Sequence, residues 1–210
     1  MAEDPSSSSG EPATTIEAPL FPLPNVFLGA GMLLPLNVFE PRYCELVRWT
    51  LERQRHVAMA LYDPLRPPEP DGAPPIFSVV GLGRIEEQIE LPGGRYHLFV
   101  RGLARCRVLA EDRSRPFRVG RLAVLHPTVH DSAEVHALAN MLTARLGLQT
   151  THPCEDDAAC AVLTDRMLQF LPLDALTRQS IFATQDLGRR LLAFHRFLDT
   201  VQSPASPDRN

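Results

Sequence analysis

The segment Pro19–Tyr43 reads PLFPLPNVFLGAGMLLPLNVFEPRY, and no residue between Glu17 and Glu40 carries a formal charge. An apolar stretch of about 20 residues is long enough for a membrane-spanning helix. Three prolines and two glycines interrupt this one, however, and residues 1–18 contain no arginine or lysine. A spanning helix and a signal peptide are therefore both disfavoured. We expect buried extended segments joined by turns, at the start of a folded domain of a cytoplasmic protein without a membrane span.

The composition limits the chemistry that the chain can perform. Of its 210 residues 44% are hydrophobic, which is enough for a sizeable core, and the formal net charge is −4. All 21 basic residues are arginine. The absence of lysine excludes a P-loop lysine, a Schiff base and a Ser–Lys hydrolytic pair. No Gly-x-Ser-x-Gly motif supplies a serine nucleophile. We therefore expect neither enzyme activity nor a cofactor.

The four cysteines are too few and too scattered for a disulfide scaffold. Cys44 and Cys106 lie in apolar surroundings and are predicted to be buried free thiols. The cluster that most resembles a set of metal ligands is His152, Cys154 and Cys160. Its Cys-x5-Cys spacing is not that of a zinc site, and no second cysteine pair supports it. We expect no metal there.

The first half of the chain has the pattern of a β-rich domain. A helix is predicted to begin at Pro41, a residue that suits the first helical turn, and to end near His56. The apolar run Val57–Tyr62 predicts a buried strand, and the six prolines in residues 63–75 predict an irregular loop. Two further strands are expected, at Cys106–Ala110 and Phe117–Leu125.

Apolar and polar residues alternate before two consecutive glycines at positions 93–94. This pattern predicts a β-hairpin with a two-residue turn. With a tight turn, Ile89 faces Leu98 on an apolar side of the hairpin, and Glu86 faces Arg101 on a polar side. The meeting of opposite charges supports this register.

The second half of the chain shows helical periodicity. Asp131 begins a helix with a capping box, and Gly147 ends it. Further helices are expected after Pro153, after Asp174 and from about Thr184. Buried faces are predicted for the first, second and last of these four helices. They contain, in that order, Val135, Leu138, Leu142 and Leu146; Ala159, Leu163, Met167 and Phe170; and Leu187, Leu191, Phe194, Leu198 and Val201.

Strands first and helices afterwards indicate an α+β fold. We predict a β-rich subdomain over residues 16–128 and a helical bundle over residues 129–202. Polar stretches rich in serine and proline predict disordered tails at residues 1–15 and 203–210.

Two blocks of this sequence resemble the N-terminal, substrate-binding domain of Lon proteases. The family pattern P-L-F-P-L, spacer, L-P-L, hydrophobic pair and E-P-R-Y is matched by elements of residues 19–43. Residues 80–109, VGLGRIEEQIELPGGRYHLFVRGLARCRVL, are similar to the family's Gly-x-Gly strand, glycine hairpin and Gly-x-x-Arg strand. The resemblance covers about residues 17–200. It implies a PUA-like β-barrel subdomain followed by a C-terminal helical bundle.

The resemblance also implies a function. It points to a non-enzymatic module that binds unfolded or degron-bearing polypeptides, or a protein partner, as an adaptor or regulator of protein turnover. The ATPase and Ser–Lys protease of Lon have no counterpart in the sequence, so a stand-alone member is expected. The candidate residues for the binding groove are Phe39, Arg42, Trp49, Tyr62 and Tyr96.

The alternative hypothesis is RNA binding, because PUA-like barrels include RNA-binding members. Arginines are concentrated between residues 101 and 121, and guanidinium groups suit phosphate and stack on bases. The candidate contacts are Arg105, Arg107 and Arg118. The acidic net charge and the few aromatic residues nearby count against nucleic acid as a partner.

Overall fold

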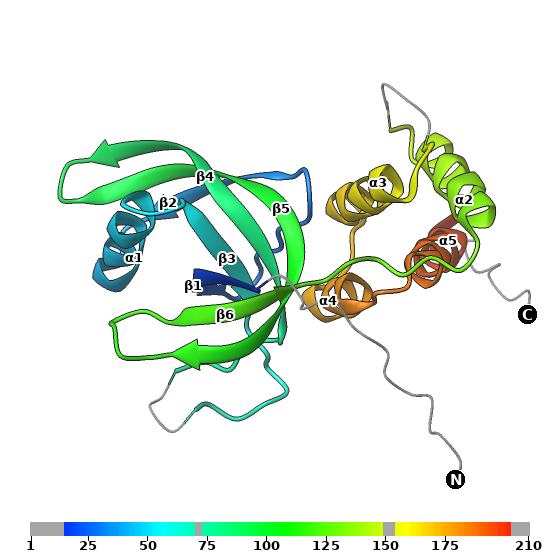
Figure 1. Ribbon diagram of the computed structural model, residues 1–210. Coiled ribbons are helices and arrows are strands. Elements are labelled where there is room, and N and C mark those ends of the chain that lie inside the picture. Colours follow the sequence, from blue (N-terminus) through cyan, green and yellow to red (C-terminus); the bar gives the residue numbers. More distant parts are fainter. Residues whose placement is uncertain (1–14, 70–72, 149–153, 203–210) are drawn as a thin grey trace, which may run out of the picture.

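The computed structural model describes residues 15–69, 73–148 and 154–202, and Figure 1 shows a β-barrel on one side and a group of helices on the other. Six strands form a sheet in the order β2-β5-β4-β3-β1-β6, and an additional pairing between β5 and β6 closes the barrel. All pairings between these six strands are antiparallel except that of β1 with β3. The strands are β1 (Thr15–Leu23), β2 (Leu33–Val38), β3 (His56–Leu61), β4 (Val79–Leu91), β5 (Arg95–Asp112) and β6 (Val119–Val124).

The helices divide between the two halves of the molecule. One covers an end of the barrel and the others form the bundle (Figure 1). They are α1 (Pro41–Leu51), α2 (Ser132–Arg145), α3 (Asp157–Phe170), α4 (Ala175–Ala183) and α5 (Leu187–Gln202). The predicted α+β class, with a barrel followed by a bundle, is confirmed. No helix in the described part of the chain is both long and apolar enough to cross a membrane.

The loop between β1 and β2 packs so closely on the barrel that two barrel positions, 81 and 102, require glycine. A Cβ atom on Gly81 would lie 2.0 Å from the Leu28 carbonyl oxygen, and one on Gly102 would lie 1.9 Å from that of Gly29. The segment between β1 and β2 therefore crosses directly over β4 and β5, and only glycine permits this approach. On its other side the segment meets the bundle, since the Ala30 N–H donates to Asp165 Oδ2 at 2.9 Å.

The β4–β5 hairpin turns through three residues, 92–94, rather than two. Ile89 consequently lies opposite His97 instead of Leu98, and it is 55% exposed. The predicted register and the inward orientation of Ile89 are therefore wrong. Pro92 is the reason, because it cannot donate a hydrogen bond to the ladder and joins the turn. The two glycines that follow it have φ values of 83° and 70°.

A β-bulge in β4 restores one predicted contact. The register shifts between Ile85 and Glu87, so that Glu86 projects from the ladder and forms an ion pair with Arg101. This predicted ion pair is confirmed, although the register that suggested it is not. β5 runs unbroken over Arg95–Asp112, where a separate strand had been expected from Cys106.

The helix cap predicted at Asp131 is present in the structure, whereas the predicted buried faces of the helices are wrong at some of their end residues. Asp131 accepts a hydrogen bond from the Glu134 N–H at 3.0 Å, as the capping box predicts. Ala159, Phe170 and Val201 are exposed, contrary to prediction. Each lies in the first or last turn of its helix, where the neighbouring elements no longer cover the apolar face.

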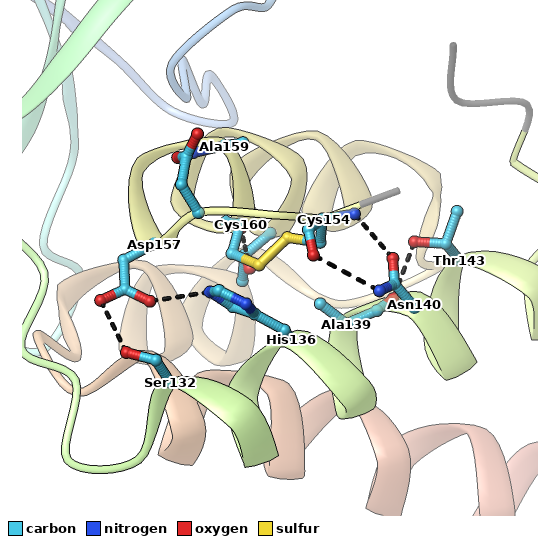
Figure 2. The surroundings of a disulfide bond; sticks show 11 residues. Ser132, His136, Ala139, Asn140, Thr143, Cys154, Asp157, Ala159 and Cys160 are labelled. Atoms are coloured by element: carbon cyan, nitrogen blue, oxygen red, sulfur yellow. Dashed lines mark hydrogen bonds and ion pairs between the residues drawn. A yellow bond between two sulfur atoms is a disulfide. The ribbon is translucent and has the colours of Figure 1, made fainter. Parts of the chain in front are cut away.

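The cysteines bring one confirmation and one correction. Cys44 and Cys106 are buried free thiols as predicted, and burial raises the pKa of the Cys106 thiol to about 11. Cys154 and Cys160 are joined by a disulfide that the sequence did not predict (Figure 2). Their Cα atoms lie 5.4 Å apart, because the first turn of α3 folds back on the segment that enters it. His152 lies outside the described residues.

Candidate functional site

The five residues predicted for a binding groove do not line one surface. Phe39, at the end of β2, is 67% exposed, whereas Tyr96 is only 3% exposed and belongs to the barrel core. Tyr96 therefore offers no surface to a partner. Tyr62 is half-buried, and Arg42 and Trp49 lie near opposite ends of α1.

Arg42 borders a small cavity, here called the α1 pocket, between the start of α1 and the loop that joins β5 to β6. The pocket has a volume of about 120 Å³. Arg42 stacks over the Tyr43 ring at 4.5 Å and forms an ion pair with Glu40 at 2.9 Å. Burial, together with the neighbouring Tyr62, raises the pKa of Tyr43 to about 12. The pocket thus combines a cation with a neutral aromatic wall.

Trp49 is half-buried beside the same loop. Its ring centroid lies 6.0 Å from that of Phe117, and the guanidinium groups of Arg53 and Arg115 lie over its ring at 4.1 and 5.7 Å. Trp49 also lines a separate pocket of about 420 Å³ with His56. Its place between two cations gives the indole a packing role and leaves part of it accessible.

Two of the three arginines proposed for nucleic-acid binding, Arg105 and Arg118, are buried. Arg105 is 4% exposed and donates to the carbonyl oxygens of Phe182 and Thr184 at 2.9 and 2.7 Å. Burial, and then Arg190 nearby, lower the pKa of Arg105 to about 10. Arg118 is 8% exposed, and of the three only Arg107 lies on the surface. The structure gives RNA binding no support.

A serine, a histidine and an aspartate meet at the disulfide, but their order is not that of a hydrolase. The Ser132 hydroxyl donates to Asp157 Oδ2 at 3.0 Å, and His136 Nε2 lies 2.9 Å from Asp157 Oδ1 (Figure 2). The carboxylate thus lies between the other two side chains. A catalytic triad instead needs the imidazole beside the nucleophile. This group joins α2 to α3.

The outer edge of β2 presents unpaired backbone groups. Within the described residues β2 pairs with β5 alone. The Gly102 N–H donates to the Met32 carbonyl at 2.8 Å, which makes Leu33–Arg101 a pair without direct hydrogen bonds. By alternation the N–H groups of Leu33 and Asn37 point away from β5. Pro35 lies at an equivalent position, where the lack of an N–H costs no ladder bond.

Apolar side chains lie next to this edge on the outside of the barrel. Residues opposite each other in the register share a face, so Pro35 adjoins Phe99, and His97 lies between Asn37 on β2 and Ile89 on β4. Leu33, Phe39 and Ile89 are 42%, 67% and 55% exposed. We call this surface the β2 face. It consists of Leu33, Pro35, Phe39, Ile89 and Phe99.

Sequence reasoning found Phe39 but missed the rest of the β2 face. The alternation in residues 33–38 was a usable signal, because an antiparallel strand with one face in the core places Leu33 and Pro35 opposite to Leu34 and Leu36. Ile89 was missed because a two-residue turn directs it inward. Nothing in the sequence marked the arginines of the β5–β6 loop as neighbours of α1.

Comparison with known families gives one match over nearly the whole chain. Residues 17–200 match the family model of the ATP-dependent protease La (LON) substrate-binding domain. Among curated relatives, the Lon protease of Brevibacillus choshinensis is 23% identical over 192 residues, and that of Escherichia coli strain K12 is 24% identical over 193. These alignments cover 87% and 86% of this chain. The chain spans about a quarter of the length of these relatives, 24% in each case.

Solved structures agree with this assignment. A Lon N-terminal domain protein from Xanthomonas campestris is 27% identical, with a TM-score of 0.62. The match covers 86% of this chain and 98% of that one. The N-terminal domain of the Mycobacterium avium complex Lon protease has the same TM-score at 14% identity and covers 88% and 98%. The second likeness concerns the fold alone.

Proposed function

The chain belongs to the family of the ATP-dependent protease La (LON) substrate-binding domain, and on this premise we propose that it recognises polypeptides without catalysing a reaction on them. The recognised form is an unfolded or degron-bearing polypeptide in an extended conformation. The protein then acts as an adaptor or regulator of protein turnover.

One observation supports this proposal most: the free edge of β2 lies beside the apolar β2 face. The outward N–H groups of Leu33 and Asn37 can pair with the carbonyl groups of an added strand. Such main-chain bonds do not depend on sequence, so they suit a binder of many unfolded chains. Leu33 and Phe39 offer apolar contacts to alternate side chains of the ligand.

The edge is selective because it is partly blocked. Pro35 removes one N–H from the row, and edge prolines limit uncontrolled pairing between sheets. A folded protein has few unpaired strands to offer, whereas an unfolded chain can align one with β2. This surface therefore favours unfolded chains over their native counterparts.

Fluorescence anisotropy with a labelled, reduced and carbamidomethylated lactalbumin tests the proposal. Asn37→Pro removes an outward N–H, and we expect it to weaken binding about tenfold. Asn37→Ala keeps the N–H and is expected to change the affinity less than about twofold. Ile89→Gln should also weaken binding, whereas Leu109→Gln, which removes a 48% exposed leucine far along β5, should not. Equal affinities for all four variants would contradict the proposed surface.

A further inference from the structure

The α1 pocket concentrates positive charge in a small space. Its volume of about 120 Å³ is below the range of about 300–1,000 Å³ found for sites of whole small molecules. Among the described residues, no acidic side chain lines it. The lining includes four arginines, which are Arg42, Arg113, Arg115 and Arg118. A single anionic side chain or chain terminus fits this space and charge.

Arg118 brings an unused donor to the wall of the pocket. It is 8% exposed, and its Nη2 donates to the Pro74 carbonyl at 2.7 Å. Its buried Nη1 forms an ion pair with the Glu111 carboxylate at 3.6 Å, but it makes no hydrogen bond within the described part of the chain. Buried N–H groups almost always have a partner. An acceptor bound in the pocket would supply it.

Arg115 adds a second guanidinium group, which makes no salt bridge within the described residues although the Asp112 carboxylate lies near it. Its guanidinium lies 5.7 Å from the centre of the Trp49 ring. Hydrogen bonds from Ser114, and then the charge of Arg115, lower the pKa of the Asp112 carboxyl. Arg42 and Arg113 are already paired with Glu40 and Glu111, at 2.9 and 3.1 Å. An anion that binds at Arg115 would therefore displace no salt bridge of the described residues.

The remaining lining residues of the pocket favour a ligand with an apolar group next to its anionic group. Tyr43 and Phe117 provide ring surfaces, and Pro74 and Pro116 provide apolar surface without an N–H group. Guanidinium groups bind carboxylates through two parallel hydrogen bonds. A carboxylate attached to an apolar or aromatic group thus matches both parts of the lining.

We propose that the α1 pocket binds a carboxylate of the recognised polypeptide. This inference rests on the proposed function for the identity of the ligand, but the pocket's affinity for a carboxylate can be measured without a polypeptide. The carboxylate comes from an aspartate or glutamate side chain or from the C-terminus of the bound chain. The two sources are separated below.

The first experiment uses the full chain and a small probe. Trp49 is the single tryptophan of the sequence and lies beside Arg115, so its fluorescence reports on the pocket. We expect 3-phenylpropionate to give a saturable change, together with NMR shifts at Tyr43 and Phe117, and 3-phenylpropionamide to give neither. The Arg42→Gln/Arg115→Gln variant should lose the response. Arg48→Gln, which changes an exposed arginine of the same helix outside the pocket, should keep it.

The second experiment compares three labelled apolar decapeptides of one sequence. One has an internal aspartate and an amidated end, one has asparagine and a free C-terminus, and one has asparagine and an amidated end. We expect one carboxylate peptide to bind about tenfold more tightly than the neutral peptide, since hydrogen bonds to charged groups are stronger. The preferred peptide identifies the source, and the Arg42→Gln/Arg115→Gln variant should abolish the preference.

The outcomes separate the two proposals. If no peptide binds but 3-phenylpropionate titrates Trp49 and its amide does not, polypeptide recognition fails and the carboxylate site stands. If all three peptides bind equally and the two small probes behave alike, the carboxylate site is overturned while polypeptide recognition stands.

Discussion

Asp165 on α3 and Arg190 on α5 form an ion pair whose side chains are only 3% and 0% exposed. The other oxygen of Asp165 accepts a hydrogen bond from the Ala30 N–H of the barrel's first loop at 2.9 Å. One buried carboxylate therefore joins two helices of the bundle to the barrel. Gln179 adds a second link, since its Nε2 donates to the Val79 carbonyl at 2.8 Å. These contacts make the two halves a single structural unit.

Breaking this ion pair should strongly destabilise the protein. We expect Asp165→Ala to lower the free energy of unfolding by about 3–5 kcal/mol, because Arg190 is left as an unpaired buried charge. The nearby Arg189→Ala, at an exposed side chain, should cost less than about 1 kcal/mol. Urea denaturation measures both. A loss for Asp165→Ala no larger than that of the control would contradict the buried link.

Gly102 should not tolerate a side chain. A Cβ there would lie 1.9 Å from the Gly29 carbonyl oxygen, so Gly102→Ala is expected to cost about 3 kcal/mol or to prevent folding. Gly188 provides a matched control in α5, since the nearest atom to its Cβ would be 3.4 Å away. Gly188→Ala should be neutral or stabilise by up to about 1 kcal/mol. Thermal unfolding of the two variants tests the crossing of the first loop.

The buried face of α5 gives a third prediction. Leu191 and Phe194 are 0% exposed, and replacing either by Ala should destabilise by about 2–5 kcal/mol. Val201, which is 58% exposed in the last turn of the same helix, serves as the control, and Val201→Ala should cost less than about 0.5 kcal/mol. Similar losses at Leu191 and Val201 would show that the helix face is assigned wrongly.

Tyr43 should make stability depend on alkaline pH. Its pKa is about 12 in the folded protein, against an ordinary value of 10, because burial disfavours the phenolate. The folded state thus holds the proton more tightly. The contribution is complete below pH 10 and is lost as the pH rises through 12. Stability of the Tyr43→Phe variant should fall less over that range, and the absorbance difference between the two proteins should titrate near 12. A midpoint near 10 would contradict the burial.

The sequence predicted those parts of the structure that depend on local chemistry. The caps at Asp131 and Asp174 could be predicted because each side chain accepts a hydrogen bond from the first turn of its own helix. The start of α1 could be predicted because Pro41 fits the first turn of a helix. The glycine positions of the barrel were matched through family resemblance. Their physical cause, the loop passing over Gly81 and Gly102, appears only in three dimensions.

What the sequence missed depends on register and distance. One extra residue in the turn, Pro92, reversed the orientation of Ile89, because side chains alternate with a period of two. Arg105 and Arg118 formed part of an arginine cluster in sequence. Their partners, Phe182 and Pro74, are 77 and 44 residues away. No local pattern reveals that such arginines are buried.

Amide hydrogen exchange on β2 tests polypeptide recognition most directly. The N–H groups of Leu33 and Asn37 point to the free edge, whereas that of Leu36 points to β5 and serves as an internal control. With saturating unfolded lactalbumin we expect exchange at Leu33 and Asn37 to slow at least about tenfold and exchange at Leu36 to change little. Unchanged exchange at Leu33 and Asn37 in a bound complex would show that polypeptides are recognised elsewhere or not by strand addition.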